Sequence, residues 1–382
     1  DLQLRISLEP IRDLKIDLTA NRTRNRSREI QYMFEGMPDT HSGNFSMSII
    51  SIGSAFERPS AGDGYHSGTF ERFRRNLDVI RDRVESQFLG AQYPQGSALA
   101  GKTFDPANGT ISKHSPDVMI PAFLAAYTGR SARNSALDFF PSLFSMMPNW
   151  RITYTGLTKI AWFKKNFRSV NLNHAYRSTY SVGSYNTFQS FMSYMGDIGF
   201  VEDVQSGNPI PSSRFDISMV SINEQFSPLI GMDATLKNGL TAKVEYKTSR
   251  ILNLSMSACQ LVETASRDFV IGLGYKIVNF NLFSGRNVKD SKNRVSHDLA
   301  LRADISFRNQ SALCRDIQQG FAQATNGNKA LKISCSADYT LSRLLTLRLY
   351  YDRQQNTPLI SSSSYPVVSA DFGFSMKFSL TR

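Results

Sequence analysis

The chain has 382 residues, of which 41% are hydrophobic, 11% aromatic and 20% charged, and its formal net charge is +12. This length is typical of two or three globular domains, unless one large sheet or barrel accounts for it. The most apolar run, residues 120–127, is far shorter than the ~20 residues of a membrane-spanning helix. A spanning helix is thereby excluded, whereas alternating membrane strands are not, because their average composition resembles that of a soluble protein.

The basic residues are scattered, apart from two short clusters at 21–29 (NRTRNRSRE) and 70–76 (FERFRRN). Binding of nucleic acid would need a basic patch with stacking aromatics or a known motif, and the sequence has neither. We therefore expect no nucleic-acid partner and interpret the charge as a solvated surface. The three cysteines have neither disulfide-framework nor metal-ligand spacing, so free thiols are expected.

Alternation of apolar and polar residues begins near the N-terminus, where Leu14, Ile16, Leu18 and Ala20 are separated by polar residues. This period of two predicts a sheet with one apolar and one polar face. It recurs through most of the chain. The predicted strands are 2–9, 13–22, 27–36, 44–54, 150–156, 168–182, 212–226, 229–237, 240–249, 252–262, 267–280, 296–308, 329–341, 343–355 and 367–381.

Residues 57–149 do not alternate, and we predict a helical insertion there that leaves from the outer rim and lies at the rim or in the lumen. Phe70, Phe73, Leu77, Ile80 and Val84 have helical spacing, after a candidate N-cap at residue 67 or 69. Residues 115–129 (SPDVMIPAFLAAYTG) have a serine N-cap, a proline at the first helical position and a terminal glycine. A short helix is also predicted at 159–167, with two aromatic and two basic residues typical of a membrane–water interface.

Several connections are short, at 10–13, 227–229 and 341–343, whereas 183–211 and 309–328 are predicted to be long. Short turns at one rim and long loops at the other are typical of outer-membrane barrels. The 237–239 turn and the 284–295 connection do not follow this rule. A soluble β-sandwich also alternates, but its strands average ~5–6 residues, whereas many here run longer. The sequence therefore predicts an all-β chain forming an antiparallel transmembrane β-barrel, with residues 1–56 and 150–382 as membrane strands.

The strand count carries a further expectation. A self-contained barrel has an even number of strands, whereas fifteen are predicted here. The chain also begins at Asp1, without an initiator methionine or signal peptide. We therefore expect it to be the C-terminal portion of a larger barrel.

The sequence gives no sign of an enzyme, a metal site or a cofactor site. The five histidines are far apart, and no nucleophile-elbow, P-loop or zincin motif is present. His174 shares the apolar face of its strand, so we interpret it as an interfacial or hydrogen-bonded histidine. Glycines inside strands, as in IGLGY (271–275), are expected to let a strand bend or a bulky neighbour lie over them.

The last strand carries a possible barrel-assembly signal. Asp371, Gly373, Met376 and Phe378 fit the polar-x-Gly-x-x-apolar-x-apolar pattern of a final outer-membrane strand, although four more residues follow Phe378.

Three long blocks resemble one known family. They are 115–129, 148–185 (PNWRITYTGLTKIAWFKKNFRSVNLNHAYRSTYSVGSY) and 221–250 (SINEQFSPLIGMDATLKNGLTAKVEYKTSR). They closely resemble the C-terminal region of the SprA/Sov family, the outer-membrane translocon of the type 9 secretion system. The resemblance implies a very large single-chain barrel that passes folded cargo proteins with C-terminal secretion domains, and that is linked in some bacteria to gliding motility. It also implies a PorV-type lateral barrel and a periplasmic plug protein as partners.

Within such a barrel, the alternation assigns residues to the lumen or to outer-membrane lipid. The predicted lumen-facing residues are Arg5, Lys15, Asp17, Lys243, Glu245, Arg302, Asp304, Arg308, Lys332, Asp338, Arg348, Asp352, Asp371 and Lys377. The predicted lipid-facing residues are Leu299, Leu301, Ile305, Leu347, Leu349, Phe372, Phe374 and Phe378. The mixed signs in the lumen would suit cargo of varied charge. Two alternatives remain open: another large outer-membrane barrel, such as a nutrient transporter or lipopolysaccharide exporter, and a soluble β-sandwich adhesin.

Overall fold

The computed structural model describes residues 1–30, 32–33, 39–106, 111–203, 205–280, 298–341, 344–360 and 365–378. Within these residues the chain is mostly β, and thirteen strands form one large antiparallel sheet. Some sequence predictions fall wholly or partly outside them: the 27–36 and 296–308 strands, the 284–295 and 341–343 connections, and the residues after Phe378.

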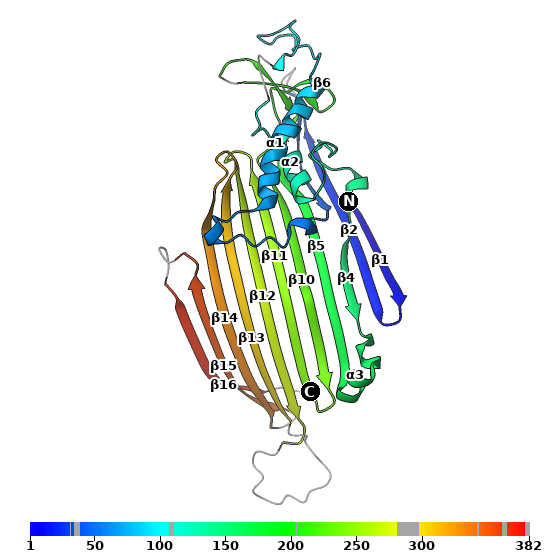
Figure 1. Cartoon of the computed structure of the whole chain (residues 1–382), viewed down its shortest axis with the longest axis vertical. Coiled ribbons are helices and arrows are strands. Elements are labelled where there is room, and N and C mark those ends of the chain that lie inside the picture. The colour runs from blue at the N-terminus through cyan, green and yellow to red at the C-terminus, as the bar shows by residue number, and fades with distance from the viewer. Residues whose placement is uncertain are drawn as a thin grey trace, which may run out of the picture.

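The strands of the large sheet are long and follow the chain order across it (Figure 1). Their order is β1-β2-β3-β5-β10-β11-β12-β13-β14-β15-β16, with β4 and β9 off this path. Their bounds are β1 Leu2–Ile11, β2 Leu14–Glu29, β3 Thr40–Ser48, β4 Asn149–Tyr154, β5 Phe167–Thr187, β9 Phe215–Ile217, β10 Met219–Leu236, β11 Leu240–Ser255, β12 Gln260–Ile277, β13 Leu299–Asp316, β14 Ala322–Thr340, β15 Leu345–Pro358 and β16 Val367–Phe378.

Strands β3 and β4 share one position in the sheet, between β2 and β5. The N-terminal half of β2 pairs with β4 and its C-terminal half with β3, and β5 pairs with both in the same way. The side chains of Ser48 and Asn149 are hydrogen-bonded at 3.1 Å where the two strands meet. One strand position is therefore interrupted by residues 49–148. The insertion leaves from inside the sheet, whereas the sequence prediction placed its departure at a rim.

The fifteen predicted strands occupy eleven positions along the described sheet. The predicted turn at 227–229 is wrong, because Ser227 and Pro228 lie in a bulge within the continuous strand β10. Proline, which cannot donate a ladder hydrogen bond, is tolerated at a bulge. Removing that turn places 237–239 at the same end of the sheet as the β1–β2 turn. The predicted long loop at 309–328 is also wrong, since β13 and β14 continue to a tight turn at 317–321.

The insertion contains helices α1 (Gly68–Gln87) and α2 (Pro116–Tyr127), with short 3₁₀ turns at Ile52–Ser54, Ala61–Asp63 and Leu143–Ser145. Ser67, one of the two N-cap candidates in the sequence, caps α1 by accepting a hydrogen bond from the backbone N–H of Phe70. The buried residues of α1 include all five predicted from its helical spacing. A small sheet of β6 (Met192–Met195), β7 (Ile198–Glu202) and β8 (Pro209–Ser213) lies beyond β5, and helix α3 (Ala161–Asn166) follows β4.

The insertion and the small sheet lie at one end of the strands, which we call the insertion end (Figure 1). There they form the main apolar core with the sheet. Phe73 and Phe123 of the helices are fully buried in it, as are Tyr180, Ile222 and Leu252 of the strands. Burying large aromatic and aliphatic side chains stabilises this contact by ~1.5–3 kcal/mol each. The rest of the large sheet has no covering layer among the described residues.

Candidate functional site

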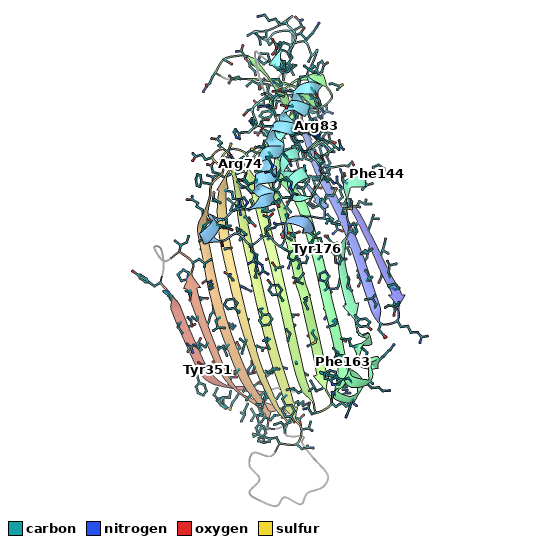
Figure 2. The ribbon with its side chains drawn as sticks, viewed as in Figure 1. Arg74, Arg83, Phe144, Phe163, Tyr176 and Tyr351 are labelled. Carbon is teal, nitrogen blue, oxygen red and sulfur yellow. The ribbon has the colours of Figure 1, made fainter. Side chains whose placement is uncertain are left out.

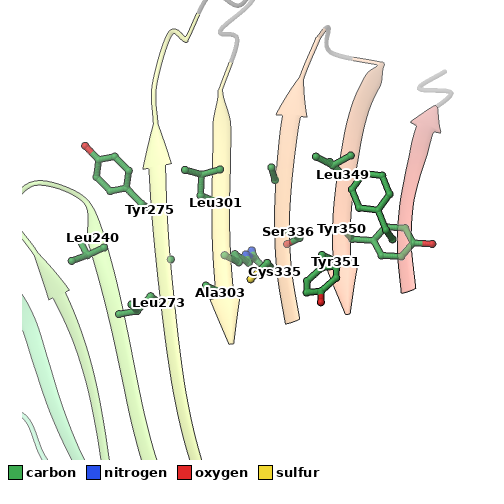
Figure 3. Close-up of a pocket in the computed structure, with 14 residues that line it drawn as sticks. Leu240, Leu273, Tyr275, Leu301, Ala303, Cys335, Ser336, Leu349, Tyr350 and Tyr351 are labelled. Carbon is green, nitrogen blue, oxygen red and sulfur yellow. The ribbon is translucent and has the colours of Figure 1, made fainter. Parts of the chain in front are cut away.

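One face of the large sheet carries an exposed apolar surface away from the insertion. The register places Leu240, Tyr275, Leu301, Leu349 and Phe374 in one row, with Ala337 between the third and fourth. Figure 3 shows these strands side by side, with Leu273, Tyr275, Leu301, Leu349 and Tyr351 among the side chains drawn. A shallow apolar groove runs among them over the small side chains of Ala303, Cys335 and Ala337.

We call this surface the apolar belt. It comprises the exposed residues Leu273, Tyr275, Leu301, Ile305, Phe307, Leu331, Leu349, Tyr351, Phe372, Phe374, Met376 and Phe378, together with Phe269. Ile305 is 46% exposed, and Phe372 is 73% exposed. All eight residues predicted to face lipid lie on this face, since Leu299 pairs with Tyr339 and Leu347 with Met376. The sequence pattern therefore brings them together on a single surface.

The other face of the sheet is polar and carries both signs of charge. A second row contains, in order, Lys243, Gly272, Asp304, Ser334, Asp352 and Asp371. The alternation puts all the residues predicted to face a lumen on this polar face. Surface ion pairs link neighbours on it, such as Lys243 with Glu245 at 3.0 Å. Exposed pairs of this kind contribute at most ~1 kcal/mol, so the polar face is wettable rather than held together by charge.

The four residues of the assembly pattern lie in the edge strand β16. Asp371 and Gly373 are on the polar face, and Met376 and Phe378 are on the apolar face. The side chain of Tyr350 lies directly over Gly373, where a Cβ would overlap its ring. Gly272 lies in the same way under Asp304. The glycines thus let a neighbouring side chain lie over the strand, as the sequence suggested for residues 271–275.

The insertion covers the same face that carries the belt. In β11 the positions of Leu240, Val244 and Tyr246 continue, at the same alternation, to Leu252 and Leu254, which are fully buried under the insertion. The insertion therefore lies on the apolar face, opposite to the face predicted to line a lumen. Figure 2 shows Arg74 of α1 at the tops of these strands, where its Nε donates to the Ile317 carbonyl at 3.2 Å.

A buried charged network fastens the insertion to the sheet. Arg250 of β11 lies opposite Glu224 of β10, and their side chains form an ion pair of 2.7 Å. Arg250 also donates to the carbonyl and the hydroxyl of Ser54, at 2.6 and 2.8 Å. The second oxygen of Glu224 accepts from Ser51 and Tyr176, at 2.6 and 2.9 Å. The first residues of the insertion are thus held by charged side chains of two strands.

A second buried ion pair fastens the insertion to the adjacent strands. Arg315 of β13 is 1% exposed and contacts Glu263 of β12 at 3.1 Å. It also donates to the Tyr65 carbonyl at 2.7 Å and lies over the Phe70 ring. These two ion pairs were not predicted from the sequence, although the sequence contains a signal for them. Glu224, Arg250, Glu263 and Arg315 each occupy an apolar-face position in four successive strands.

Glu57 closes the start of the insertion by binding the first turn of α1. Its carboxylate accepts hydrogen bonds from the Ser67 hydroxyl and from the Thr69 N–H and hydroxyl, the last at 2.6 Å. Burial raises the pKa of Glu57, but the hydrogen bonds outweigh burial and leave the pKa below its usual value. A carboxylate with a lowered pKa stabilises the fold above its unfolded pKa and loses that effect as the pH falls through its folded pKa.

We expect Glu57→Gln to loosen the start of α1 at pH 7 by about 1 kcal/mol, because a charged acceptor is replaced by a neutral one. The difference from the native chain should shrink as the pH falls below the ordinary glutamate pKa of about 4.3, and should disappear below the lowered pKa of the folded state. Hydrogen exchange of the Thr69 and Phe70 amides, measured across that range, checks the prediction. A difference that is unchanged between pH 7 and pH 3.5 would contradict it.

The opposite end of the sheet carries an exposed aromatic group. Trp162 of α3 is 61% exposed, and its ring contacts those of Phe163 and Phe167. Figure 2 shows Phe163 at this end of the strands. Lys164 and Lys165 follow in the same helix. His174 lies on the apolar face and is hydrogen-bonded through Nδ1 to the Leu229 carbonyl at 2.6 Å.

Comparison with models of known protein families gives no match, and comparison with curated proteins gives none either. In the described part of the chain, no helix is long and apolar enough to cross a membrane.

Proposed function

We propose that this chain forms part of the wall of an outer-membrane β-barrel, with the apolar belt against lipid and the polar face toward an aqueous lumen. The observation that carries the proposal is the belt itself. Exposed Leu, Ile, Phe and Tyr side chains continue from β12 to β16, and the described residues supply no second sheet to cover them. Large exposed apolar surfaces mark interaction with another protein or with a membrane.

The height of the belt supports a bilayer as the covering medium. In β13 the hydrophobic residues of the apolar face run from the half-buried Leu299 to Phe307, nine residues counted inclusively. A tilted membrane strand needs ~9–11 residues to cross the hydrocarbon core. Beyond Phe307 the apolar-face positions of β13 are Asn309 and Ser311, followed by Leu313 and Arg315, which are buried under the insertion. The strand thus changes from lipid-compatible to water-compatible where a nine-residue span ends.

Among outer-membrane barrels, we propose the translocon of the type 9 secretion system, because of the resemblance to the SprA/Sov family. Two of the resembling blocks, 148–185 and 221–250, form the adjacent strands β4, β5, β10 and β11, and the third contains α2. The buried network of Tyr176, Glu224 and Arg250 lies within these blocks. A polar face of mixed sign also suits a pore that passes folded proteins of different charge.

In this proposal the chain is the C-terminal portion of a very large single-chain barrel, and the insertion stands outside the wall at the cell surface. The partners would be a PorV-type lateral barrel, a periplasmic plug protein and cargo with C-terminal secretion domains. The chain acts as a conduit and needs no catalytic group or cofactor.

Depletion of the full-length protein in the cells that make it tests the proposal. We expect cargo with C-terminal secretion domains to accumulate in the periplasm, and the protein to co-purify from detergent with a second barrel. Normal cargo export with a loss of nutrient uptake or of surface lipopolysaccharide would support the rival barrels instead. Recovery of the full-length protein in the soluble fraction without detergent would support an adhesin.

A further inference from the structure

Strand β2 changes character along its apolar face. Positions 14, 16, 18 and 20 of this face are Leu, Ile, Leu and Ala, and the next four positions of the same face are all arginine. These are Arg22, Arg24, Arg26 and Arg28, which we call the arginine stripe. Its last three members are exposed. The basic cluster seen in the sequence at 21–29 is thus one line of guanidinium groups that continues the apolar face of β2.

The stripe is held in place mainly by rings rather than by carboxylates. The guanidinium of Arg22 lies 5.1 Å from the centre of the Phe45 ring, and that of Arg24 lies 4.6 Å from the centre of the Phe140 ring. Stacking on an aromatic face fixes the guanidinium plane and leaves N–H groups at its edge to bind an anion. One N–H of Arg22 donates to the Pro141 carbonyl at 3.5 Å.

Further along the stripe, Arg26 contacts His41 at 3.3–3.4 Å, and Arg28 pairs with Asp39. In the described residues, no carboxylate lies within ion-pair distance of Arg22, Arg24 or Arg26. The Nε of Arg22 is buried and has no hydrogen-bond partner there. Three of the four cations therefore have no counter-charge from the chain.

The level of the stripe relative to the hydrocarbon core indicates which anion it would bind. Leu2 and Leu4 of β1 pair with Arg22 and Ala20, so the exposed aliphatic residues of β1 end level with the first arginine. Each further residue rises ~3.3 Å along the strand, so the stripe crosses the layer directly above the hydrocarbon core. In the outer leaflet of an outer membrane, that layer holds the phosphate groups of glycolipids. Arginine binds phosphate through paired, charge-assisted hydrogen bonds.

We infer that the arginine stripe binds the phosphate groups of outer-leaflet glycolipid and thereby fixes the level of this wall segment in the membrane. The inference rests on the proposed outer-membrane barrel, since it needs the belt to face lipid. The other basic cluster, at 70–76, has a different use, because Arg74 donates to carbonyls of the β13–β14 turn.

The test uses the full-length protein, purified in detergent from the outer membrane, and bis-phosphorylated lipid A as the probe. We expect the double variant Arg24→Gln/Arg26→Gln to bind lipid A at least tenfold more weakly than the native protein. The matched control is Arg5→Gln/Arg177→Gln, which removes two exposed arginines from the polar face and should leave binding unchanged. Native mass spectrometry or titration into micelles measures the affinity.

Two further probes make the outcome specific. Dephosphorylated lipid A should bind the native protein and the stripe variant equally, and millimolar inorganic phosphate should not displace lipid A. Equal lipid A affinity of the native protein and the stripe variant would overturn the inference, even where the protein is found in the outer membrane. Displacement by free phosphate would overturn it in favour of a soluble anion. Absence of the native protein from the outer membrane would instead overturn the proposed barrel.

Discussion

Ile305→Arg is expected to prevent stable assembly of the sheet in a membrane. Ile305 lies in the middle of the belt, paired with Ile271 and Ile333 in the neighbouring strands, and is 46% exposed. An arginine on the lipid face near the bilayer midplane costs ~2–4 kcal/mol. That cost is a large share of the net stability of a folded protein. The fraction of full-length protein in the outer membrane, and the urea concentration at which it unfolds in lipid vesicles, measure the effect.

The matched control places the same side chain on the polar face in the adjoining strand. Ser334 of β14 is next to Ile333 in the chain, and its register partners are Asp304 and Asp352. We expect Ser334→Arg to change the stability by less than about 0.5 kcal/mol, as is usual for surface substitutions. If the two variants assemble equally well, the belt does not face lipid. If both fail, the polar face is not aqueous.

The two faces of the sheet could be predicted from the sequence because alternation is a local property. A residue two positions along a strand lies on the same face whatever the strand pairs with. The residues assigned to each face, such as Leu301 and Arg302, therefore lie where the pattern puts them. The helices could be predicted for the same reason, since the cap at Ser67 and the apolar spacing of α1 are local signals.

The interruption of a strand between Ser48 and Asn149 could not be predicted, because it depends on pairing between distant segments. Two short apolar segments that share one position in a sheet look like two strands in the sequence. The bulge at Ser227 and Pro228 misled the count in the same way, since this dipeptide more often marks a turn. Each error changes the apparent direction of every later strand. For this reason some turns were assigned to the wrong rim, whereas the strand residues were assigned to the correct faces.

The position of the insertion could have been predicted from charged residues that break the alternation. A glutamate or arginine on an apolar face is costly in lipid, and therefore marks the part of the strand that another segment covers. Glu224 lies in the predicted 212–226 strand and Arg250 directly follows the predicted 240–249 strand, and the structure pairs these two residues in adjacent strands. That pairing and the partners from residues 51–65 required the structure.

Arg250→Met is expected to release the first part of the insertion from the sheet. The substitution leaves Glu224, which is 2% exposed, without its cation, and removes two hydrogen bonds to Ser54. Removing one partner of a buried ion pair costs ~3–5 kcal/mol, because the other charge stays buried. We expect faster hydrogen exchange and proteolysis in residues 51–69, with the belt strands still protected. The exposed pair of Arg308 and Asp268 is the control, and Arg308→Met should cost less than about 1 kcal/mol.

A double variant separates loss of the pair from loss of packing. In Arg250→Met/Glu224→Gln no charge is left buried alone, and the neutral side chain can still accept from Ser51 and Tyr176. We therefore expect the double variant to restore part of the protection lost in Arg250→Met, since the effects of substitutions on stability are not additive for residues in contact. If the single and double variants exchange equally fast, the ion pair is not what holds the insertion. Its attachment would then depend on the apolar core around Phe73 and Ile222 alone.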